Sequence, residues 1–418
     1  MNFAPDPGFS ENSLSDPSAF RSWLAVISVS LGSFVLVTSE FLPIGLLTQI
    51  SSSLRISDGT AGLMVTVPGL VAAVAAPAMT IGAGHIDRRT LVLTLIAVLV
   101  ASDLVSAFAS SFAVMLASRV MFGVSLGGFW TIAVTLGNRL VPKSQMAKAT
   151  TVILAGVSIA TVLGVPAGTV IAAYAGWRAS FAVIGGAAFL AGLVQLFVLP
   201  SLPPPPSPGV SQLTHSLRHA DVRLGLMTVA CVIAGHFAAY TYVTPFLKDN
   251  AKVGLGLIST ILLAYGVAGV IGNFVGGAAA ARHLRPTVTC VVGLLAGSIF
   301  LLPFFHQSLA GVILLIVLWG LAFGGMPISL NLWVFKAAPE ALEGGAALLI
   351  STFQIFIALG SVLGGHIVDA LGTSAVMWAA GASILLGLLF VVLSRHAPQP
   401  AAIPSPTDPA LACPCVGD

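Results

Sequence analysis

The chain has 418 residues, of which 57% are hydrophobic and only 7% are charged, and its mean hydropathy is +1.03. Since soluble domains carry about 25% charged residues, this composition excludes an ordinary soluble protein and predicts a multi-pass membrane protein. The net charge of +3 gives no reason to expect a nucleic-acid partner. The four cysteines suggest no disulfide framework, and the two in the C-terminal tail are too few for a closed metal site.

The chain begins with a short polar segment. Residues 1–21 contain Asp6, Glu11 and Asp16 and have no basic residue before Arg21. They lack the basic start and the small-residue cleavage site of a signal peptide, so we expect a disordered cytoplasmic tail that precedes the first span.

Twelve long apolar segments follow the tail. Each is long enough to cross a bilayer as a helix, which needs about 20 residues, and separate spans must be helical because a helix satisfies its own backbone hydrogen bonds. The predicted spans cover residues 22–48, 60–83, 90–109, 112–137, 147–174, 179–199, 222–247, 255–280, 286–305, 308–335, 343–369 and 374–394.

A proline-rich segment divides these spans into two sets of six. The four consecutive prolines at 203–206 cannot continue a helix, so we expect residues 200–220 to form a cytoplasmic linker. It separates an N-terminal six-helix bundle, residues 22–199, from a C-terminal one, residues 221–396, and residues 397–418 form a second disordered cytoplasmic tail. The predicted fold class is therefore an all-α membrane protein with twelve transmembrane helices.

Basic residues determine the predicted orientation. Twelve of the 17 Lys and Arg residues fall in segments on the same side as the N-terminus, and four fall in loops on the opposite side. The positive-inside rule therefore places both termini in the cytoplasm, with the protein in the cytoplasmic (inner) membrane. The remaining basic residue, Arg119, lies within the fourth span.

The two halves of the chain look like copies of each other. A single offset of 197 residues pairs identical residues in the two halves: Arg88/Arg285, Thr90/Thr287, Gly123/Gly320, Gly127/Gly324, Gly128/Gly325, Pro142/Pro339, Ile153/Ile350 and Gly168/Gly365. We interpret these matches as an internal duplication. Two parallel six-helix repeats are the architecture of major facilitator transporters, whose substrate site lies between the halves near the midplane.

The segment 38–47, Thr-Ser-Glu-Phe-Leu-Pro-Ile-Gly-Leu-Leu, carries the first functional candidate. Glu40 is the only acid or base between Arg21 and Arg55, and its position predicts a depth past the midplane, within the hydrocarbon. A carboxylate there costs roughly 2.5–3.5 kcal/mol and favours its protonated form, so such a residue is a functional candidate. A permanently protonated structural acid and an acid at the water interface are the alternatives.

The fourth span provides a basic partner. Arg119 lies about two turns from the outer end of that span, close to the predicted depth of Glu40, and Asp103 in the third span falls at a similar level. A buried arginine stays charged and needs a carboxylate partner. We hypothesise a proton-coupling cluster in which protonation of Glu40 releases Arg119 and biases one conformation. A static ion pair, and an Asp103 that faces water, are the alternatives.

The fourth span also contains a G-x-S-x-G pattern, Gly123-Val124-Ser125-Leu126-Gly127, which is typical of hydrolase nucleophiles. That pattern needs a strand-turn-helix elbow, whereas here it lies within a predicted membrane helix. We interpret Gly123 and Gly127 as a G-x-x-x-G face for close helix packing.

The loop between the second and third spans contains Asp87 and Arg88. We consider that Asp87 forms a charged link to a neighbouring helix end and so acts as a latch for one conformation. The alternative is a simple topological charge.

Aromatic and polar residues within the spans form the predicted substrate pocket. His236 and Tyr240 are four residues apart and share one face of the seventh span, where the histidine binds a substrate hydroxyl, relays a proton or packs in the core. The predicted pocket consists of Phe41, Phe129, Trp130, His236, Tyr240, Gln354 and Asn273.

These residues resemble the twelve-span drug/proton antiporter family of the major facilitator superfamily. The resemblance covers residues 22–395 and is carried by the segment 38–47, by the R-x-x-x-G-x-x-x-G-G-F-W run from Arg119 to Trp130, and by G-W-R-x-x-F from Gly176 to Phe181. These motifs look like the sugar-efflux and purine-ribonucleoside-efflux branch. The segment that begins at His236 is similar to the sugar-efflux members, and the N-terminal half is closer to the nucleoside exporters.

The resemblance implies roles for further residues. Arg119 matches the arginine of span 4 that the family ties to proton coupling. The other matched residues belong to the cytoplasmic loop motif and to the antiporter motif of span 5, and their implied role is gating or structural: Asp87, Arg88, Gly164, Pro166 and Gly168. The sequence departs from the loop motif at Ala83, where the family has glycine.

We therefore expect a secondary transporter that exports a small organic solute (a sugar, a nucleoside or a drug-like compound) in exchange for protons by alternating access. Its expected partners are that substrate, protons and the lipid bilayer. We expect a monomer, with no cofactor, no metal and no enzymatic activity. The alternatives are a proton-coupled importer, a non-transporting sensor, and an intramembrane enzyme that uses Glu40, His236 and Ser125.

Overall fold

The computed structural model describes residues 17–82, 86–142, 145–203, 220–337 and 342–393. Twelve helical segments in these ranges are long and apolar enough to cross a membrane, which confirms the predicted fold class. The two predicted tails, apart from residues 17–21, and most of the predicted linker lie outside the described residues.

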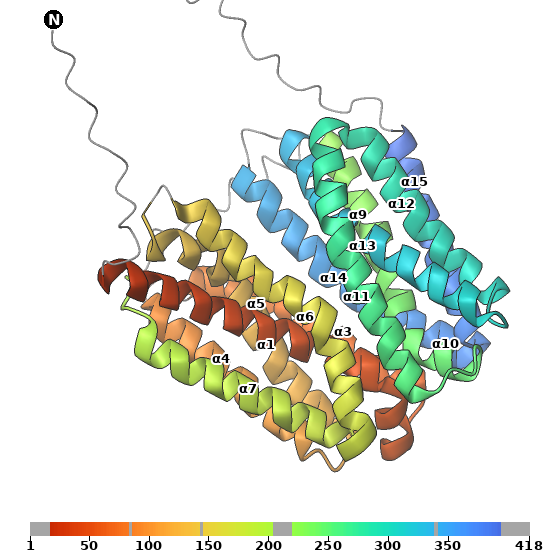
Figure 1. The fold of residues 1–418 in the computed structure, drawn as a ribbon, viewed down its shortest axis with the longest axis horizontal. Helices are drawn as coiled ribbons and strands as arrows, with labels where there is room; N and C mark the ends of the chain where they lie inside the picture. The colour runs from red at the N-terminus through yellow and green to blue at the C-terminus, as the bar shows by residue number, and fades with distance from the viewer. Residues whose placement is uncertain (1–16, 83–85, 143–144, 204–219, 338–341, 394–418) are drawn as a thin grey trace, which may run out of the picture.

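The helices form two groups, which Figure 1 shows in red to yellow-green and in green to blue. The first group, here called the N-half, contains α1 (Pro17–Leu54), α2 (Asp58–Ala61), α3 (Leu63–Gly82), α4 (Arg88–Ala107), α5 (Phe112–Leu140), α6 (Met146–Ala175) and α7 (Trp177–Val198). The second, the C-half, contains α9 (Ala220–Thr241), α10 (Val243–Asp249), α11 (Leu255–Arg282), α12 (Leu284–Leu301), the 3-10 helix η2 (Leu302–Phe304), α13 (Leu309–Ala337), α14 (Leu342–Leu371) and α15 (Thr373–Leu393).

The bundle has two ends, which we name by the chain termini. The terminal face is the end at which α1 begins and α15 ends, and the distal face is the opposite end, at which α1 ends. The predicted span 222–247 is divided near the distal face into α9 and α10. Pro245 has no N–H to donate to the carbonyl of Thr241, and the Tyr242 amide instead bonds the Ala239 carbonyl in a turn.

Helix packing confirms the internal duplication. A Cβ atom at Gly123 of α5 would meet the backbone of Pro68 in α3, with 2.8 Å to the Pro68 oxygen. A Cβ atom at Gly320 of α13 would meet the backbone of Tyr265 in α11 in the same way. Gly320 lies 197 residues after Gly123, and Tyr265 lies 197 residues after Pro68, as the sequence comparison predicts. In both halves the glycine lets two helices approach closely.

The single offset of 197 is wrong for other helices. Gly164 of α6 packs against Thr38 of α1, and Gly360 of α14 packs against Ala234 of α9, an offset of 196. The same offset makes Gly364, and not Gly365, the counterpart of Gly168. It also relates two hydrogen bonds, Arg89 to the Leu196 carbonyl and Arg285 to the Val392 carbonyl, so that Arg89, and not Arg88, is the counterpart of Arg285. The loops of the two halves differ by one residue, which an ungapped comparison cannot accommodate.

The two halves are joined by hydrogen bonds at the distal face. The carboxylate of Asp369, near the end of α14, accepts a hydrogen bond of 2.6 Å from the Ser57 hydroxyl and one of 2.9 Å from the Gly59 amide of α2. We call these three residues the distal latch. Behind it, the Ser361 hydroxyl of α14 donates to the Gly62 carbonyl of the N-half at 3.0 Å.

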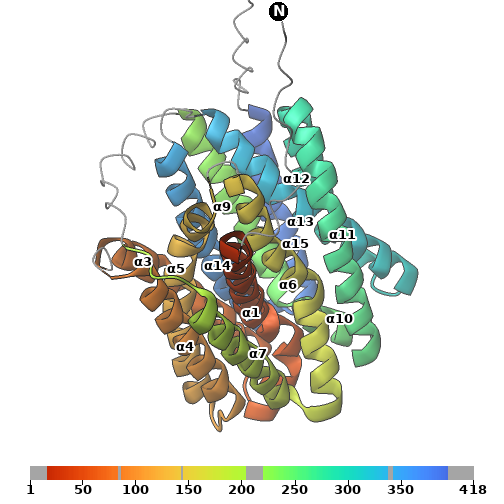
Figure 2. The same cartoon turned by 60° about the vertical axis from the view of Figure 1, so that its left-hand side comes forward.

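Contact between the halves continues to the middle of the bundle and then weakens. Thr169 of α6 shares a hydrogen bond with Ser259 of α11, and these two helices lie side by side in Figure 2. On the other side, Gly69 of α3 is buried against α14. On the same face of α3, Ala73 is only half-buried and Pro77 is exposed. The halves therefore meet at the distal face and diverge toward the terminal face.

Gly59→Ala is expected to prevent the distal face from closing. The added Cβ would overlap the Gly365 carbonyl oxygen and the Asp369 carboxylate, so the closed state loses its close helix approach. A bias of only about 1.4 kcal/mol changes the populations about tenfold. Spin labels on cysteines at the exposed residues Arg55 and Leu371 should report longer distances in this variant.

The matched control for that variant is Gly186→Ala, because nothing lies within 4 Å of the Cβ position at Gly186 in α7. We expect this control to leave both the distances and transport unchanged. Unchanged distances in Gly59→Ala would show that the latch does not depend on close backbone approach.

Candidate functional site

A buried ion pair lies inside the N-half. Arg119 of α5 and Asp103 of α4 have fully buried side chains, and their charged atoms Nη2 and Oδ1 are 3.4 Å apart. Ser39 of α1 donates a hydrogen bond of 2.6 Å to the same Oδ1, and its carbonyl accepts one of 3.3 Å from Arg119 Nη1. The pair therefore connects three helices.

Additional contacts fix the guanidinium. Arg119 Nη2 donates to the Ser106 hydroxyl at 2.8 Å, and its Cζ lies about 5 Å from the ring centres of Phe122 and Phe181. Two buried polar atoms of the pair, Oδ2 of Asp103 and Nε of Arg119, have no hydrogen-bond partner in the described part of the chain. Unpaired buried polar atoms cost free energy, so this arrangement is not the most stable one for a core.

The C-half provides an internal comparison for this ion pair. By the offsets that helix packing defines, the counterparts of Ser39, Asp103 and Arg119 are glycine and two isoleucines: Gly235, Ile299 and Ile316. Both isoleucines are fully buried in the hydrophobic core. The same architecture is therefore built without charges in one half, and the fold itself does not require the ion pair.

Glu40 follows Ser39 in α1 but does not join the ion pair. Among the described residues, the guanidinium of Arg119 pairs with Asp103, and no hydrogen bond or ion pair joins it to Glu40. This differs from the expected Glu40–Arg119 pair, because Ser39 and not Glu40 is on the face of α1 toward α4 and α5. Glu40 is half-buried. The following residue, Phe41, contacts the C-half, so Glu40 lies on α1 beside the interface between the halves.

The second polar centre is His236 of α9, which is fully buried among aromatic rings. The indole Nε1 of Trp319 in α13 donates a hydrogen bond of 3.0 Å to His236 Nδ1. The ring of Phe323 stacks on the imidazole with a centroid distance of 3.6 Å. The other imidazole nitrogen, Nε2, is buried and has no partner in the described residues.

Rings from both halves surround His236. Tyr240 stacks on the imidazole at 5.3 Å and on Tyr265 of α11 at 5.0 Å between ring centres. Phe41 of the N-half stacks on Phe237 at 5.9 Å and meets Tyr240 edge-on. We call this set the aromatic cluster: Phe41, His236, Phe237, Tyr240, Tyr265, Trp319 and Phe323. Three of its members are predicted pocket residues (Phe41, His236 and Tyr240), and the other four, Phe237, Tyr265, Trp319 and Phe323, are not.

Glu40 and His236 are at equivalent positions in the duplicated fold. With the offset of 196 that relates α1 to α9, Glu40 corresponds to His236 and Phe41 to Phe237. Each half therefore places one titratable side chain, followed by a phenylalanine, on its first helix. The two phenylalanines stack on each other across the interface.

The other predicted pocket residues lie elsewhere. Phe129 is fully buried inside the N-half, with Trp130 edge-on at 6.2 Å. Gln354 is half-buried on α14, and its carbonyl oxygen would be 3.1 Å from a Cβ atom at Gly69 of α3. Asn273 is half-buried toward the terminal end of α11. None of these four residues contacts the aromatic cluster through a ring contact or hydrogen bond in the described part of the chain.

The G-x-S-x-G segment lies in the continuous helix α5. The Ser125 hydroxyl is buried and donates to the Leu95 carbonyl at 2.8 Å, and Gly127 packs against Ala72 of α3. In α6, Gly164 and Gly168 pack against α1, and Pro166 is buried between them. These glycines therefore serve close helix packing.

Asp87 caps α4 and connects it to the chain after α7. Its Oδ1 accepts hydrogen bonds from the Arg89 and Thr90 amides, and its Oδ2 accepts from the Ser201 hydroxyl and the Leu202 amide. The neighbouring Arg88 amide bonds the Leu202 carbonyl. These contacts stay within the N-half and its first linker residues. The hydrogen bond from Ser201, together with those from the backbone amides, lowers the pKa of the Asp87 carboxyl.

Asp87→Ala is expected to cost about 1 kcal/mol of local stability, as is typical of a lost helix N-cap. Since the pKa of Asp87 is lower in the folded protein, this contribution is complete at neutral pH and is lost only in acid below about pH 4. Hydrogen exchange should show faster exchange at the Arg89 and Leu202 amides at pH 7. In the control Asp87→Asn, which keeps one acceptor oxygen, only one of the two segments should exchange faster; equal protection in all three proteins would contradict this role.

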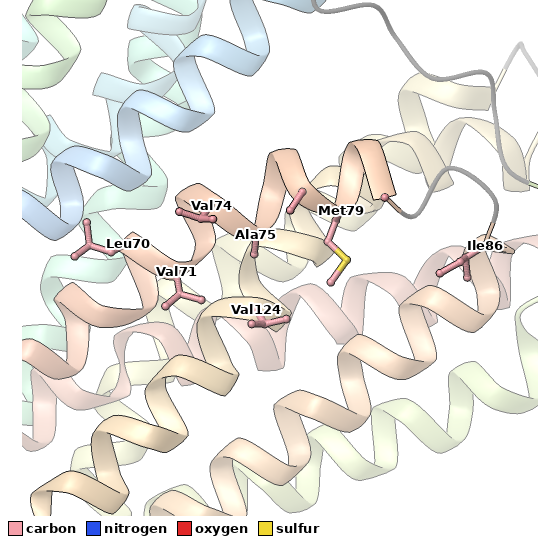
Figure 3. A pocket seen from close by; sticks show the side chains of 9 residues that line it. Leu70, Val71, Val74, Ala75, Met79, Ile86 and Val124 are labelled. Carbon is pink, nitrogen blue, oxygen red and sulfur yellow. The ribbon is translucent and has the colours of Figure 1, made fainter.

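A separate apolar groove lies on the outside of α3 toward the terminal face. Figure 3 shows its side chains on α3, with Ile86 just before α4 and Val124 on α5, and its volume is about 680 Å³. None of the predicted site residues lines it. Its α3 residues, among them Val71, Ala75 and Ala78, lie on the side of that helix away from Gly69, which packs against α14, so the groove belongs to the N-half alone.

Comparison with protein families gives one match over most of the chain. The family model described as Major Facilitator Superfamily matches residues 29–354. The purine ribonucleoside efflux pump NepI of Escherichia coli strain K12 is 31% identical over 385 residues, which are 91% of this chain and 96% of that protein. The transcription regulatory protein OpdE of Pseudomonas aeruginosa strain PAO1 is 32% identical over 390 residues, which are 92% of this chain and 97% of that protein.

Solved structures show the same fold. A bacterial homologue of the human lysosomal transporter Spinster, in an inward-facing and unoccupied conformation, aligns with a TM-score of 0.71 at 15% identity and covers 90% of this chain and 95% of that one. The same protein in an inward-facing and occupied conformation aligns with a TM-score of 0.66 at 14% identity, over 88% and 94% of the two chains. The alignments cover most of both chains, so this chain shares the fold of those structures.

Proposed function

Since this chain belongs to the major facilitator superfamily, we propose that it exports a small neutral organic solute across the cytoplasmic membrane in exchange for protons. The observation that carries the proposal is the position of Glu40. It is an acid beside the interface between the halves, half-buried, and no basic side chain pairs with it among the described residues. An acid in this position binds and releases a proton as the surrounding water changes.

Proton binding by Glu40 depends on conformation because no free positive charge in the described part of the chain stabilises its ionised form. The charge of Arg119 is already balanced by Asp103, so an ionised Glu40 must be stabilised by water. When the interface is dry, the low dielectric favours the neutral acid; when it opens to water, the proton can leave. Alternating access therefore couples Glu40 to one side of the membrane at a time. In this proposal, Arg119 and Asp103 hold α1 through Ser39 and position Glu40.

The predicted orientation places the opening between the halves on the cytoplasmic side. With both termini in the cytoplasm, as the basic residues predict, the terminal face is cytoplasmic and the closed distal face is external. The structure then has its interface open toward the cytoplasm, ready to take a solute from inside. Asp87, Arg88 and the glycines Gly123, Gly127, Gly164 and Gly168, with Pro166, would serve the helix motions between this state and the opposite one.

The substrate class that we propose is the purine ribonucleosides. Similarity to NepI over nearly the whole chain supports it, and so does the aromatic cluster, whose rings suit a flat heterocycle. We assign the primary contacts to Phe41, His236 and Tyr240 and place the half-buried Gln354 and Asn273 nearer the path to them, whereas Phe129 and Trp130 pack within the N-half.

Transport by purified protein in proteoliposomes tests the proposal. We expect inosine counterflow without a gradient and uphill inosine movement when a pH gradient is imposed. Counterflow of other solutes but not of nucleosides would contradict the substrate class, and the absence of uphill inosine movement under the imposed pH gradient would contradict the coupling.

Similarity to OpdE, which is named as a regulator, favours a second candidate: a membrane sensor that binds a solute without moving it. The same experiment separates the two functions. A sensor binds inosine or another solute but shows no counterflow.

A further inference from the structure

We infer that Trp319 is a positioning residue that fixes His236 as a neutral donor, and that His236 Nε2–H and the Tyr265 hydroxyl form a two-donor site, around the Tyr240 ring, for separate hydrogen-bond acceptors of a ligand with a flat ring. This inference rests on the proposed function for the identity of that ligand. The inferred protonation state of His236 is independent of the proposed function.

The tautomer follows from the chemistry of the indole. A tryptophan N–H is a donor only, so the nitrogen that it contacts must be an acceptor. Trp319 Nε1 contacts His236 Nδ1 at 3.0 Å, and both side chains are fully buried. Nδ1 therefore carries no proton and Nε2 carries one. A doubly protonated imidazole would place two N–H groups against each other, so His236 stays neutral while this contact exists. It is then a donor and not a proton relay.

Two donors in the cluster are unsatisfied. His236 Nε2 and the Tyr265 hydroxyl are both buried without a hydrogen-bond partner in the described residues. They come from different helices, α9 and α11. The Tyr240 ring stacks on both side chains, at 5.3 Å from His236 and 5.0 Å from Tyr265, and no ring contact joins those two in the described residues, so the two donors flank Tyr240. A buried donor without a partner is destabilised, and a ligand that supplies an acceptor removes that penalty.

The surrounding rings define the shape of the ligand. Phe41 covers Phe237 and Tyr240 from the N-half, whereas the other rings belong to the C-half. Movement of the halves relative to each other therefore uncovers the cluster. Phe41 and Phe323 are half-buried, so their rings are the ones that can give way. A flat ring with a carbonyl or a ring nitrogen, such as the base of inosine, stacks there and accepts one hydrogen bond, and the ribose oxygens of inosine offer an acceptor to the other donor.

His236 is the group whose protonation state can be observed separately from the other titratable groups near it. The other titratable groups in the cluster are the hydroxyls of Tyr240 and Tyr265, and Glu40 precedes Phe41 in α1. Nitrogen-15 spectra of histidine-labelled protein report the imidazole directly and are not confused by titration of Glu40. The His236→Gln variant assigns the signal.

The test combines that spectrum with inosine binding. We expect the wild-type spectrum to show a neutral imidazole protonated at Nε2, and inosine to shift the Nε2 signal. Trp319→Phe should lose the fixed tautomer and bind inosine about tenfold more weakly. Tyr265→Phe should weaken inosine binding by a similar factor, and His236→Gln, which keeps a donor, should be less affected than His236→Phe. Ribose, which has no flat ring, should bind no variant.

Three other results would each overturn a different claim. A cationic or Nδ1-protonated His236 in the wild type overturns the inference whatever the ligand. Inosine counterflow in the wild type with unchanged binding in Trp319→Phe and Tyr265→Phe overturns it and leaves the proposed function intact. Absence of inosine binding and counterflow in the wild type overturns the nucleoside substrate and the two-donor site for it, whereas the tautomer assignment stands or falls by the spectrum.

Discussion

Glu40→Gln is expected to abolish uphill transport driven by a pH gradient and to leave counterflow at or near the wild-type rate. Glutamine has nearly the shape of protonated glutamic acid but cannot release a proton, and Glu40 has no ion pair in the described structure that the change would break. The variant should therefore fold, bind the solute and change conformation, with coupling lost. Solute accumulation in proteoliposomes, with and without a pH gradient, measures this.

The control for that variant is Gln49→Glu, which places an acid elsewhere on the same helix and should retain coupling, since Gln49 lies in the last part of α1 near the distal face. If Glu40→Gln still accumulates the solute against its gradient, Glu40 is not the coupling residue. Loss of counterflow as well would indicate that Glu40 contributes to solute binding in addition.

The second large effect concerns the ion pair. Arg119→Ile alone should destabilise the protein by about 3–5 kcal/mol, because it leaves Asp103 buried and uncompensated. The triple variant Ser39→Gly, Asp103→Ile and Arg119→Ile copies the residues that the C-half has at these positions. We expect it to recover most of the lost stability, because the C-half packs these residues in its core.

Stability and transport should then separate. The triple variant is expected to unfold near the wild-type temperature but to lose coupled transport, since α1 is no longer held through Ser39. Thermal unfolding and transport assays on the single and triple variants measure the two properties. Wild-type coupled transport in the triple variant would contradict a functional role for the pair, and the pair would then be structural.

Much of the fold could be predicted from the sequence because a bilayer imposes strong rules. Apolar length determines the spans, and the duplicated glycines mark the close helix contacts, as Gly123 and Gly320 show. What could not be predicted was the one-residue difference between loops. A loop that is one residue longer does not change how the helices pack. Corresponding helices of the two halves therefore pack in the same way, whether the residue numbers of the pair differ by 197 or by 196.

The candidate site was only partly accessible from the sequence. Depth along a helix could be counted, and it brought Asp103, Arg119 and Glu40 to a similar level. The rotation of α1 about its axis could not be predicted, and this rotation turns Ser39, and not Glu40, toward Arg119. Ser39 and Ser106 were missed although small polar residues within an apolar span are a signal for such contacts. Trp319 and Phe323 were missed because one aromatic among many apolar residues has no distinguishing pattern.

Proton movement during transport tests the central claim most directly. Proteoliposomes that contain a pH indicator and no imposed pH gradient are given inosine on one side, and the internal pH is followed. We expect wild-type protein to move protons in the direction opposite to the solute, and Glu40→Gln to carry the solute without a pH change. A pH change of equal size in both proteins, or none in the wild type while the solute moves, would contradict the account.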